Sequence, residues 1–395
     1  MRTRILGNFR QDYAAKDLAS ASWSFQHQTY PPGARGTSGC AFSYISDRKD
    51  GQAPSPKMPE MPAFKRQTRK MTRSHKLGWI SLAVCTSLLL AGCRSQPSAE
   101  GTFDKTFTVN GPVRIELTNG SGDAHISAGA PGEVRVHGEI AAHSWSEKNS
   151  QERVQEIASN PPVSQESNLI RISGSGQHTN NVAIDYTIVV PADAEIHAAT
   201  GSGDVEVDGI KGPANFVSGS GGITASNISG DVQAMTGSGE IKFSRVQGQV
   251  QATTGSGDIT LEDVRNQVRL HSGSGGMEIT NPAESVEAST GSGDVTIKGA
   301  SADLRLRTGS GDVDIEGNPA GSNYWDIRTS SGDVVLQVSP SASFRLMAHS
   351  NSGDIDAAIP IVMEGTTQKH ELRARLGDGK ARVEVQTSSG SISLK

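Results

Sequence analysis

The sequence predicts an all-β protein whose main part is a single-chain β-solenoid with 18-residue coils. An internal repeat is the first observation, because the phrase Thr/Ser-Gly-Ser-Gly returns between Thr200 and Thr308 at a constant spacing of 18 residues. The first glycine of each copy is Gly201, Gly219, Gly237, Gly255, Gly273, Gly291 or Gly309. The other two observations are wholly apolar columns in the aligned copies and two short alternating runs in each copy.

The apolar columns lie four and six residues after the first glycine. The column at four contains Val205, Ile223, Ile241, Ile259, Met277, Val295 and Val313, and the column at six contains Val207, Ala225, Phe243, Leu261, Ile279, Ile297 and Ile315. Polar residues such as Glu206 and Thr260 alternate with them, which is typical of a strand with one buried face. A second alternating run follows, as in Val268-Arg269-Leu270 and Leu304-Arg305-Leu306. Each copy therefore holds two short strands and has no room for a helix.

One such copy cannot bury its apolar face alone, and it becomes stable only when the next copy stacks on it. Stacking places equivalent residues about 4.8 Å apart, so that each sequence column becomes a ladder of like side chains. We expect the corner glycines to supply the positive φ that a tight reversal requires. We expect the column of central serines to bond to neighbouring coils or to local backbone. These serines are Ser202, Ser220, Ser238, Ser256, Ser274, Ser292 and Ser310.

Residues 1–70 show no sustained helical or strand period and contain scattered prolines and charges, so we expect a disordered segment or an upstream extension that is not translated. Residues 71–92 follow as a basic start, an apolar run from Leu77 to Leu90 and a small-residue cleavage site. This order is typical of a signal peptide, and it favours Met71 as the start of translation.

The signal ends in Leu90-Ala91-Gly92-Cys93, which resembles the lipobox of bacterial lipoproteins. The resemblance implies that Cys93 becomes an acylated N-terminus and anchors the protein to a membrane. The other two cysteines, Cys40 and Cys85, lie in segments that we expect to be removed, so no disulfide framework is predicted. Residues 93–104 are polar and are predicted to form a tether.

Residues 105–198 are predicted to form an irregular N-terminal β region that caps the solenoid. Strand signals include Val113 to Leu117 and Val182 to Pro191, and between them lies a polar excursion, residues 144–160. Val154, Ile157 and Ala158 in this excursion could share the inner face of one short helix. A cap is needed because an open end of a solenoid exposes unpaired backbone.

Residues 199–395 are predicted to hold the solenoid repeats and the coils that close it. After Gly309 the spacing widens to 21 residues at Ser330 and again at Asn351. The degenerate corners are Thr329-Ser330-Ser331-Gly332 and Ser350-Asn351-Ser352-Gly353. The last stretch, residues 359–395, is predicted to be a closing pair of coils.

The charge balance differs between the leader and the remainder of the chain. Residues 1–92 hold 14 of the 37 Lys and Arg residues but only 5 of the 42 Asp and Glu residues. The remaining 23 basic and 37 acidic residues give residues 93–395 a net charge of −14. This balance disfavours nucleic acid and anionic lipid headgroups as partners.

Three features together resemble a known family. They are the strand Tyr186 to Pro191, the repeated Thr-Gly-Ser-Gly-Asp corner, and the terminal pair Gly377-Asp378-Gly379 and Thr387-Ser388-Ser389-Gly390. These features are similar to the bacterial "putative adhesin" β-strand-repeat family, a domain of unknown function, over roughly residues 104–395. The resemblance implies a β-repeat fold and identifies no activity.

The aspartate after the corner is the most prominent candidate for chemistry. This column consists of Asp123, Asp204, Asp258, Asp294, Asp312, Asp333 and Asp354. Calcium-binding β-rolls use a related repeat, but the column is broken at Gly222, Glu240 and Gly276, so bonds from the aspartates to backbone N–H groups at the turn are favoured. The Gly-Ser-Gly corners lack the strand-to-helix turn of a nucleophile elbow, and the dispersed histidines form no zinc motif, so no catalytic residue, metal or cofactor is predicted.

The leading hypothesis is a non-catalytic, lipid-anchored extracytoplasmic solenoid that acts as an adhesin-like binding module or as an envelope scaffold or sensing module. Its partner would be an envelope protein or a glycan, and its location the cell envelope, with the outer membrane or the periplasmic face favoured. Two alternatives remain. One is a solenoid carbohydrate-active enzyme similar to polysaccharide lyases, and the other is a calcium-stabilised β-roll.

Overall fold

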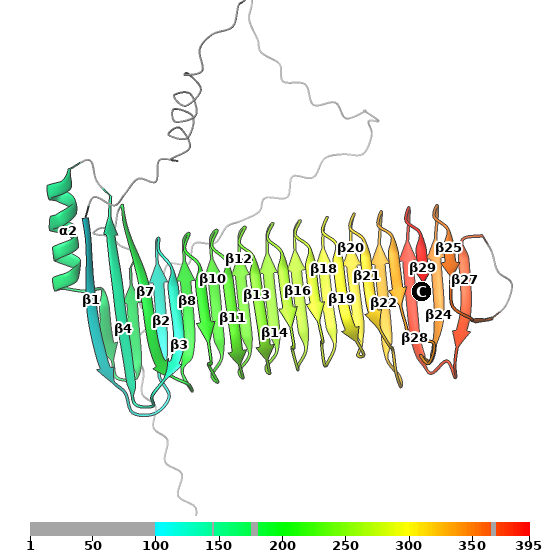
Figure 1. The fold of residues 1–395 in the computed structure, drawn as a ribbon, viewed down its shortest axis with the longest axis horizontal. Coiled ribbons are helices and arrows are strands. Elements are labelled where there is room, and N and C mark those ends of the chain that lie inside the picture. Colours follow the sequence, from blue (N-terminus) through cyan, green and yellow to red (C-terminus); the bar gives the residue numbers. More distant parts are fainter. Residues whose placement is uncertain (1–98, 144–145, 175–180, 365–368) are drawn as a thin grey trace, which may run out of the picture. The chain divides into compact units, whose positions relative to one another are not determined.

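A computed structural model of the chain describes residues 99–143, 146–174, 181–364 and 369–395. Within these residues the chain forms a two-sheet β-solenoid with one helix (Figure 1). Both the fold class and the short helix predicted from the sequence are confirmed. The predicted signal peptide (71–92), the lipobox residues Leu90, Ala91 and Gly92, and Cys93 lie outside the described residues.

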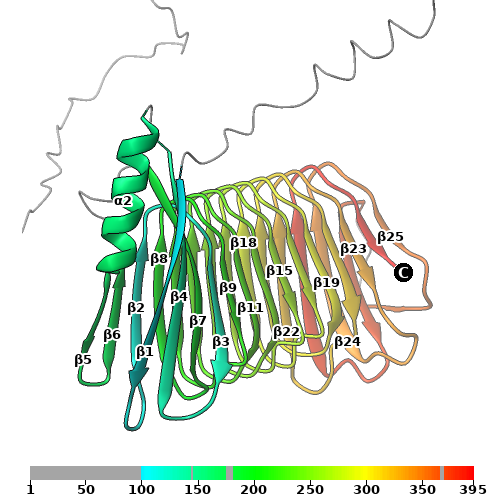
Figure 2. The ribbon, with the colours of Figure 1, turned by 60° about the vertical axis from the view of Figure 1, so that its left-hand side comes forward.

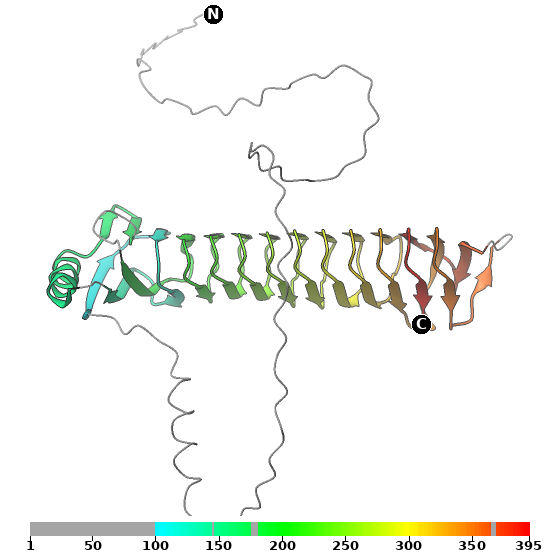
Figure 3. The same ribbon diagram turned by 90° about the horizontal axis from the view of Figure 1, so that it is seen from above.

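The strands form two long sheets that face each other across the core (Figure 3). Sheet A consists, in spatial order, of β1 (Ala99–Thr108), β4 (Glu133–Ala142), β7 (Val182–Pro191), β3 (Ala124–Gly129), β9 (Val205–Asp208), β11 (Ile223–Ile228), β13 (Ile241–Val246), β15 (Ile259–Glu262), β17 (Met277–Thr280), β19 (Val295–Ala300), β21 (Val313–Gly317), β23 (Val334–Gln337), β29 (Ile392–Leu394) and β25 (Ile355–Ala357). Sheet B consists of β26 (Val362–Met363), β27 (Glu371–Leu376), β24 (Phe344–Ser350), β28 (Ala381–Thr387), β22 (Tyr324–Thr329), β20 (Leu304–Thr308), β18 (Val286–Thr290), β16 (Val268–Ser272), β14 (Val250–Thr254), β12 (Val232–Thr236), β10 (Ala214–Ser218), β8 (Glu195–Thr200), β2 (Arg114–Asn119), β6 (Leu169–Ser173) and β5 (Val163–Glu166).

The central coils stack in parallel and in register, as the 18-residue spacing predicts. Ile241 lies opposite Ile223 on one side and opposite Ile259 on the other, and all three side chains are fully buried. Val205 continues the same file, which confirms the inward column predicted from the sequence. Burial of each such aliphatic side chain contributes about 1.5–3 kcal/mol, so that stacking compensates for the small core of any single coil.

The second corner of each coil, which leads from sheet A back to sheet B, adds a third buried column. This column contains Ile210, Ile228, Val246 and Val264. The residue before it in the loop takes a left-handed conformation, with φ of 56° at both Asn227 and Arg245 and of 79° at Gly209. In the central coils, the positive φ angles therefore belong to this corner.

The N-terminal end is covered by a cap of β1, β4, β5 and the helix α2 (Glu147–Ser159), as Figure 2 shows. Helix α2 contacts β1 and β4 and buries Val154 and Ile157, which confirms its predicted inner face. The tether predicted over 93–104 is wrong beyond residue 98, because β1 begins at Ala99 and pairs with β4 along its whole length. Phe103 holds this strand in place, since it is 5% exposed and its ring meets Tyr186 edge-on at 6.2 Å.

The coils at both ends are not stacked in the order of the sequence. The coil of β2 and β3 lies between the coil of β6 and β7 and the coil of β8 and β9. At the other end β28 and β29 lie between β22 and β23 on one side and β24 and β25 on the other. Residues 359–395 therefore do not simply close the stack, because their last coil is inserted into it. The parallel stack also begins before residue 199, where the sequence placed its start.

Candidate functional site

The corner between sheet B and sheet A is held by a buried hydroxyl that precedes the first glycine. Thr236 Oγ1 accepts a hydrogen bond from the Gly239 N–H (3.1 Å) and donates to the Gly221 carbonyl of the preceding coil (3.1 Å). The same two bonds recur at Thr254, Ser272, Thr290, Thr308, Thr329, Ser350 and Thr387. These hydroxyls are therefore committed to structure. The central serines, to which the sequence assigned this role, are exposed.

The corner glycines are required for a different reason from the predicted one. None of the seven first glycines has a left-handed φ. A Cβ added to Gly219 would instead lie 2.4 Å from the Gly201 carbonyl oxygen of the preceding coil, and a Cβ on Gly221 would lie 1.9 Å from that of Gly203. The same approach recurs at Gly201, Gly237, Gly255, Gly273, Gly291 and Gly309. The backbones of adjacent coils thus approach so closely that only glycine fits at these corner positions.

The aspartates after the corner link one coil to the next. Asp204 Oδ1 accepts the Gly222 N–H at 2.7 Å, and Asp258 Oδ1 accepts the Gly276 N–H at 2.7 Å. Each bond joins equivalent positions of adjacent coils. The donor is a backbone N–H, so the bond still forms where glycine replaces aspartate in the next coil. Among the described residues, no group of three or more His, Cys, Asp or Glu side chains is arranged to hold a metal ion.

Many of the charged side chains that these structural bonds do not use lie on the outer faces of the sheets. On sheet B, five adjacent strands carry what we call the arginine face. It consists of Arg269 on β16, Arg305 and Arg307 on β20, Arg328 on β22 and Arg382 on β28, interleaved with Glu287 on β18, Asp326 on β22 and Glu384 on β28. The arginine side chains are 42–60% exposed.

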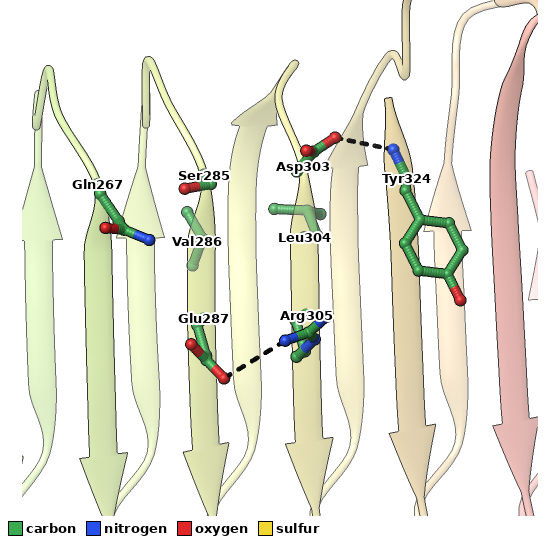
Figure 4. Close-up of a pocket in the computed structure, with 8 residues that line it drawn as sticks. All are labelled: Gln267, Ser285, Val286, Glu287, Asp303, Leu304, Arg305 and Tyr324. Carbon is green, nitrogen blue, oxygen red and sulfur yellow. Dashed lines mark hydrogen bonds and ion pairs between the residues drawn. The ribbon is translucent and has the colours of Figure 1, made fainter. Parts of the chain in front are cut away.

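A shallow groove of about 190 Å³, here called the Tyr324 groove, lies on this face (Figure 4). Gln267, Ser285 and Asp303 form one wall, because each directly precedes the first residue of β16, β18 or β20. Glu287, Arg305 and Tyr324 complete the polar lining, over a floor that includes Val286 and Leu304. The groove therefore runs across several coils and offers amide, hydroxyl, carboxylate and guanidinium groups to one ligand.

Tyr324 is fixed at the end of this groove by contacts on both sides. Its backbone N–H donates to Asp303 Oδ1 at 2.8 Å, and its hydroxyl donates to Glu384 Oε2 at 2.7 Å. The Arg382 guanidinium carbon lies 5.7 Å from the centroid of the ring. The turn between β21 and β22 is longer than the equivalent turns of the central coils, and Tyr324 follows it as the first residue of β22.

These contacts also set the ionisation of the pair. Burial, and then the bond to Glu384, raise the pKa of Tyr324 above its usual value. The bond from the Tyr324 hydroxyl is the main cause that lowers the pKa of Glu384, and the hydrogen bond from Arg382 lowers it further. Glu384 is thus held as a carboxylate that orients its neighbours.

The arginine face was not identified from the sequence, although part of its signal was visible. Arg269 and Arg305 lie at outward positions of the alternating runs, but the sequence does not by itself place Arg328 and Arg382 beside them. The insertion of β28 next to β22 brings Arg328 and Arg382 beside each other.

No helix in the described part of the chain is long and apolar enough to cross a bilayer.

Comparison with known proteins identifies a domain family. The profile of the family described as Toastrack DUF4097 matches residues 113–316 and residues 223–395. No curated protein matches the chain.

Three solved structures show similarity. A "putative cell adhesion protein" from Clostridium sporogenes shares 14% identity with a TM-score of 0.23, covering 75% of this chain and 99% of that chain. A "putative adhesin" from Bacteroides fragilis shares 14% identity with a TM-score of 0.34, covering 76% and 99%. A "putative adhesin" from Parabacteroides distasonis shares 12% identity with a TM-score of 0.25, covering 75% and 97%.

Proposed function

Because the chain belongs to the Toastrack DUF4097 family, we propose that it is a non-catalytic binding protein of the bacterial cell envelope. In this proposal the solenoid is a rigid scaffold and the outer face of sheet B is the surface that binds an envelope glycan or protein. One observation carries the proposal. The buried threonine and serine hydroxyls before the corner glycines are used in bonds between coils, as are aspartates after the corner, whereas the side chains of the outer face differ from coil to coil.

The form of the candidate site supports binding rather than catalysis. The Tyr324 groove is shallow, and its charged groups already have partners, with Glu287 3.9 Å from Arg305 and Asp303 bonded to the Tyr324 backbone N–H. A surface that spans several coils can contact an extended partner through many weak interactions.

A lipid anchor at Cys93 is part of the same proposal and is supported by the lipobox-like sequence Leu90-Ala91-Gly92-Cys93. Only residues 94–98 separate Cys93 from β1, so an acylated cysteine would keep the start of β1 within about 20 Å of the lipid. Strand β20 lies eight strand spacings from β6 at the capped end, which is about 40 Å along the stack. The binding face would therefore be displaced from the anchored end.

Two measurements test the proposed function. In cells that express the full chain, a fatty-acid probe is expected to label the protein and to fail to label Cys93→Ala. Unchanged labelling of the variant would remove the anchor from the proposal. In a sedimentation assay with isolated envelopes, we expect the folded protein to bind saturably without releasing unsaturated sugars. Release of such sugars, or no sedimentation with any envelope fraction, would refute the non-catalytic binding role.

A further inference from the structure

We propose that the arginine face binds an acidic polysaccharide, one that carries carboxylate, sulfate or phosphate groups along a chain of sugars. This inference rests on the proposed function, and it names the ligand class of the same surface. The starting observation is that charge is divided between the two sheets. With Asp303 of the Tyr324 groove included, this face has five arginines against four carboxylates, although residues 93–395 have a net charge of −14.

The outer face of sheet A at the same level of the stack has the opposite character. Strands β15, β17 and β21 carry Glu262, Glu278, Asp314 and Glu316, against Lys298 on β19. An anionic polymer would therefore be attracted to one face of the solenoid and repelled by the other.

The arginines are held in place before any ligand binds. Asp326 is only 6% exposed. Its Oδ2 accepts a hydrogen bond from Arg307 at 3.2 Å, and its Oδ1 forms an ion pair with Arg328 at 2.9 Å, so one buried carboxylate pairs with two guanidinium groups. Glu287 is half exposed and lies 3.8 Å from Arg269 and 3.9 Å from Arg305, distances of ion pairs without hydrogen bonds. A guanidinium has five N–H donors, so each arginine retains donors that point to solvent. Fixing the groups in advance lowers the entropy lost when a ligand is bound.

The spacing of the arginines fits a polymer with moderate charge density. Arg307 lies directly opposite Arg328 on the adjacent strand, and neighbouring strands are about 4.8 Å apart. Double-stranded DNA carries one charge per about 1.7 Å, and the interleaved Glu287, Asp326 and Glu384 would repel so dense an anion. A polysaccharide with a charge on each sugar or on alternate sugars could place its anions over the arginines and avoid the carboxylates.

The Tyr324 groove adds contacts that suit sugars in particular. The tyrosine offers part of its ring to the apolar face of a sugar, and Gln267, Ser285 and Asp303 offer hydrogen-bonding groups to hydroxyls. Each sugar carries several hydroxyls that both donate and accept, so it can use the amide, hydroxyl and carboxylate groups of this wall together. The combination therefore favours an acidic glycan over an acidic protein.

Binding of the full chain to polygalacturonate, measured by calorimetry at low and moderate salt, tests this inference. Fully methyl-esterified polygalacturonate is the neutral control, because it keeps the sugar backbone and loses the charge. We expect binding of the charged polymer that weakens with salt, and at least tenfold weaker binding of the esterified polymer. Absence of binding to polygalacturonate, or equal binding of both polymers, would overturn the inference.

Variants locate the site. Arg305→Gln combined with Arg307→Gln is expected to raise the Kd at least tenfold, and Arg305→Lys with Arg307→Lys to have a smaller effect, because lysine keeps the charge but loses the forked geometry. The matched control is Lys242→Gln with Lys298→Gln on sheet A, where the two side chains are 53% and 50% exposed. Thermal melting establishes that each variant is folded. Equal losses from the two glutamine pairs would overturn the site.

Competition separates the ligand classes. Polyglutamate or single-stranded DNA that displaces polygalacturonate at equal charge concentration would overturn the preference for a glycan. If the protein sediments with envelopes but does not bind polygalacturonate, the proposed function stands and only this inference is lost.

Discussion

At the scale of single residues, the buried threonine before the corner glycine forms the bonds that hold the corner, whereas the central serine of the repeated phrase is exposed. Thr254 is buried, and its hydroxyl accepts from the Gly257 N–H at 3.0 Å and donates to the Gly239 carbonyl at 3.2 Å. A single oxygen thereby closes its own turn and bonds to the preceding coil. The pattern explains why threonine and serine occupy this buried position, since apolar side chains cannot form either bond.

Replacing Thr254 with valine tests this role. The variant keeps the shape of the side chain but leaves a buried N–H and a buried carbonyl without the hydroxyl, so the free energy of unfolding should fall by about 1–3 kcal/mol. Thr253→Val is the control, because Thr253 points outward from the same strand and its replacement should change stability by no more than about 0.5 kcal/mol. Chemical denaturation measures both variants. Equal losses would contradict the assignment.

The pair formed by Tyr324 and Glu384 gives a pH-dependent prediction. Removal of the hydroxyl in Tyr324→Phe should raise the pKa of Glu384, since the hydrogen bond from this hydroxyl is the largest cause that lowers it. Because the folded protein has the lower pKa, the stabilisation is present above the pKa of the unfolded chain and is lost as pH falls through the folded pKa. The stability difference between wild type and Tyr324→Phe should therefore shrink in acid. NMR titration of the Glu384 carboxyl checks the shift, and an unchanged pKa in Tyr324→Phe would contradict the prediction.

At the scale of the strands, alternation alone determines which side chains enter the core. Strand β15 has only four residues, yet Ile259 and Leu261 are fully buried while Thr260 and Glu262 face outward. Its neighbours β13 and β17 repeat the same alternation in register. Short strands are sufficient here because each one has two parallel partners.

A charge placed on either side of β15 should have opposite consequences. Ile259→Asp buries an unpaired carboxylate and should abolish folding, whereas Thr260→Asp should change stability little, since its position lies between Lys242 and Glu278 on the outer face. Circular dichroism and thermal melting report both outcomes. Comparable damage from the two variants would show that the inward column is misassigned.

Much of the element pattern followed from the sequence, and the exceptions have physical causes. The repeat predicted the two strands of each coil and their register, because an apolar column at constant spacing has one way to form a continuous core. The position of β28 between β22 and β24 could not be predicted, since Val383 and Val385 would fit the interior of any coil equally well. The structural role of the threonines was missed because a buried hydroxyl and an exposed one look alike in a Thr-Gly-Ser-Gly phrase.

At the scale of the whole solenoid, the central coils are interchangeable units between two specialised ends. Each central coil contacts its two neighbours through the same columns, whereas the ends are built from inserted coils, antiparallel strands and α2. Stability should then approximate a sum over coils and interfaces.

Deletion of one complete coil tests this modularity. Removal of residues 237–254 joins Thr236 to Gly255 and restores the phrase, so the protein should fold with a stack shorter by about 4.8 Å and melt at a somewhat lower temperature. Removal of nine residues, 237–245, should prevent folding because the inward and outward columns no longer match. Small-angle scattering and thermal melting distinguish the two. A folded nine-residue deletion would refute strict stacking by coil.

The inserted last coil has a mechanical consequence. Strand β29 ends at Leu394 and is bonded to β23 on one side and to β25 on the other. A force that pulls on the C-terminus therefore cannot peel an edge strand away bond by bond, and must slide β29 past two neighbours at once. A protein tethered at one end and attached to a ligand along its side would resist traction in this shearing geometry, while an ordinary solenoid with its final coil at the edge would unravel.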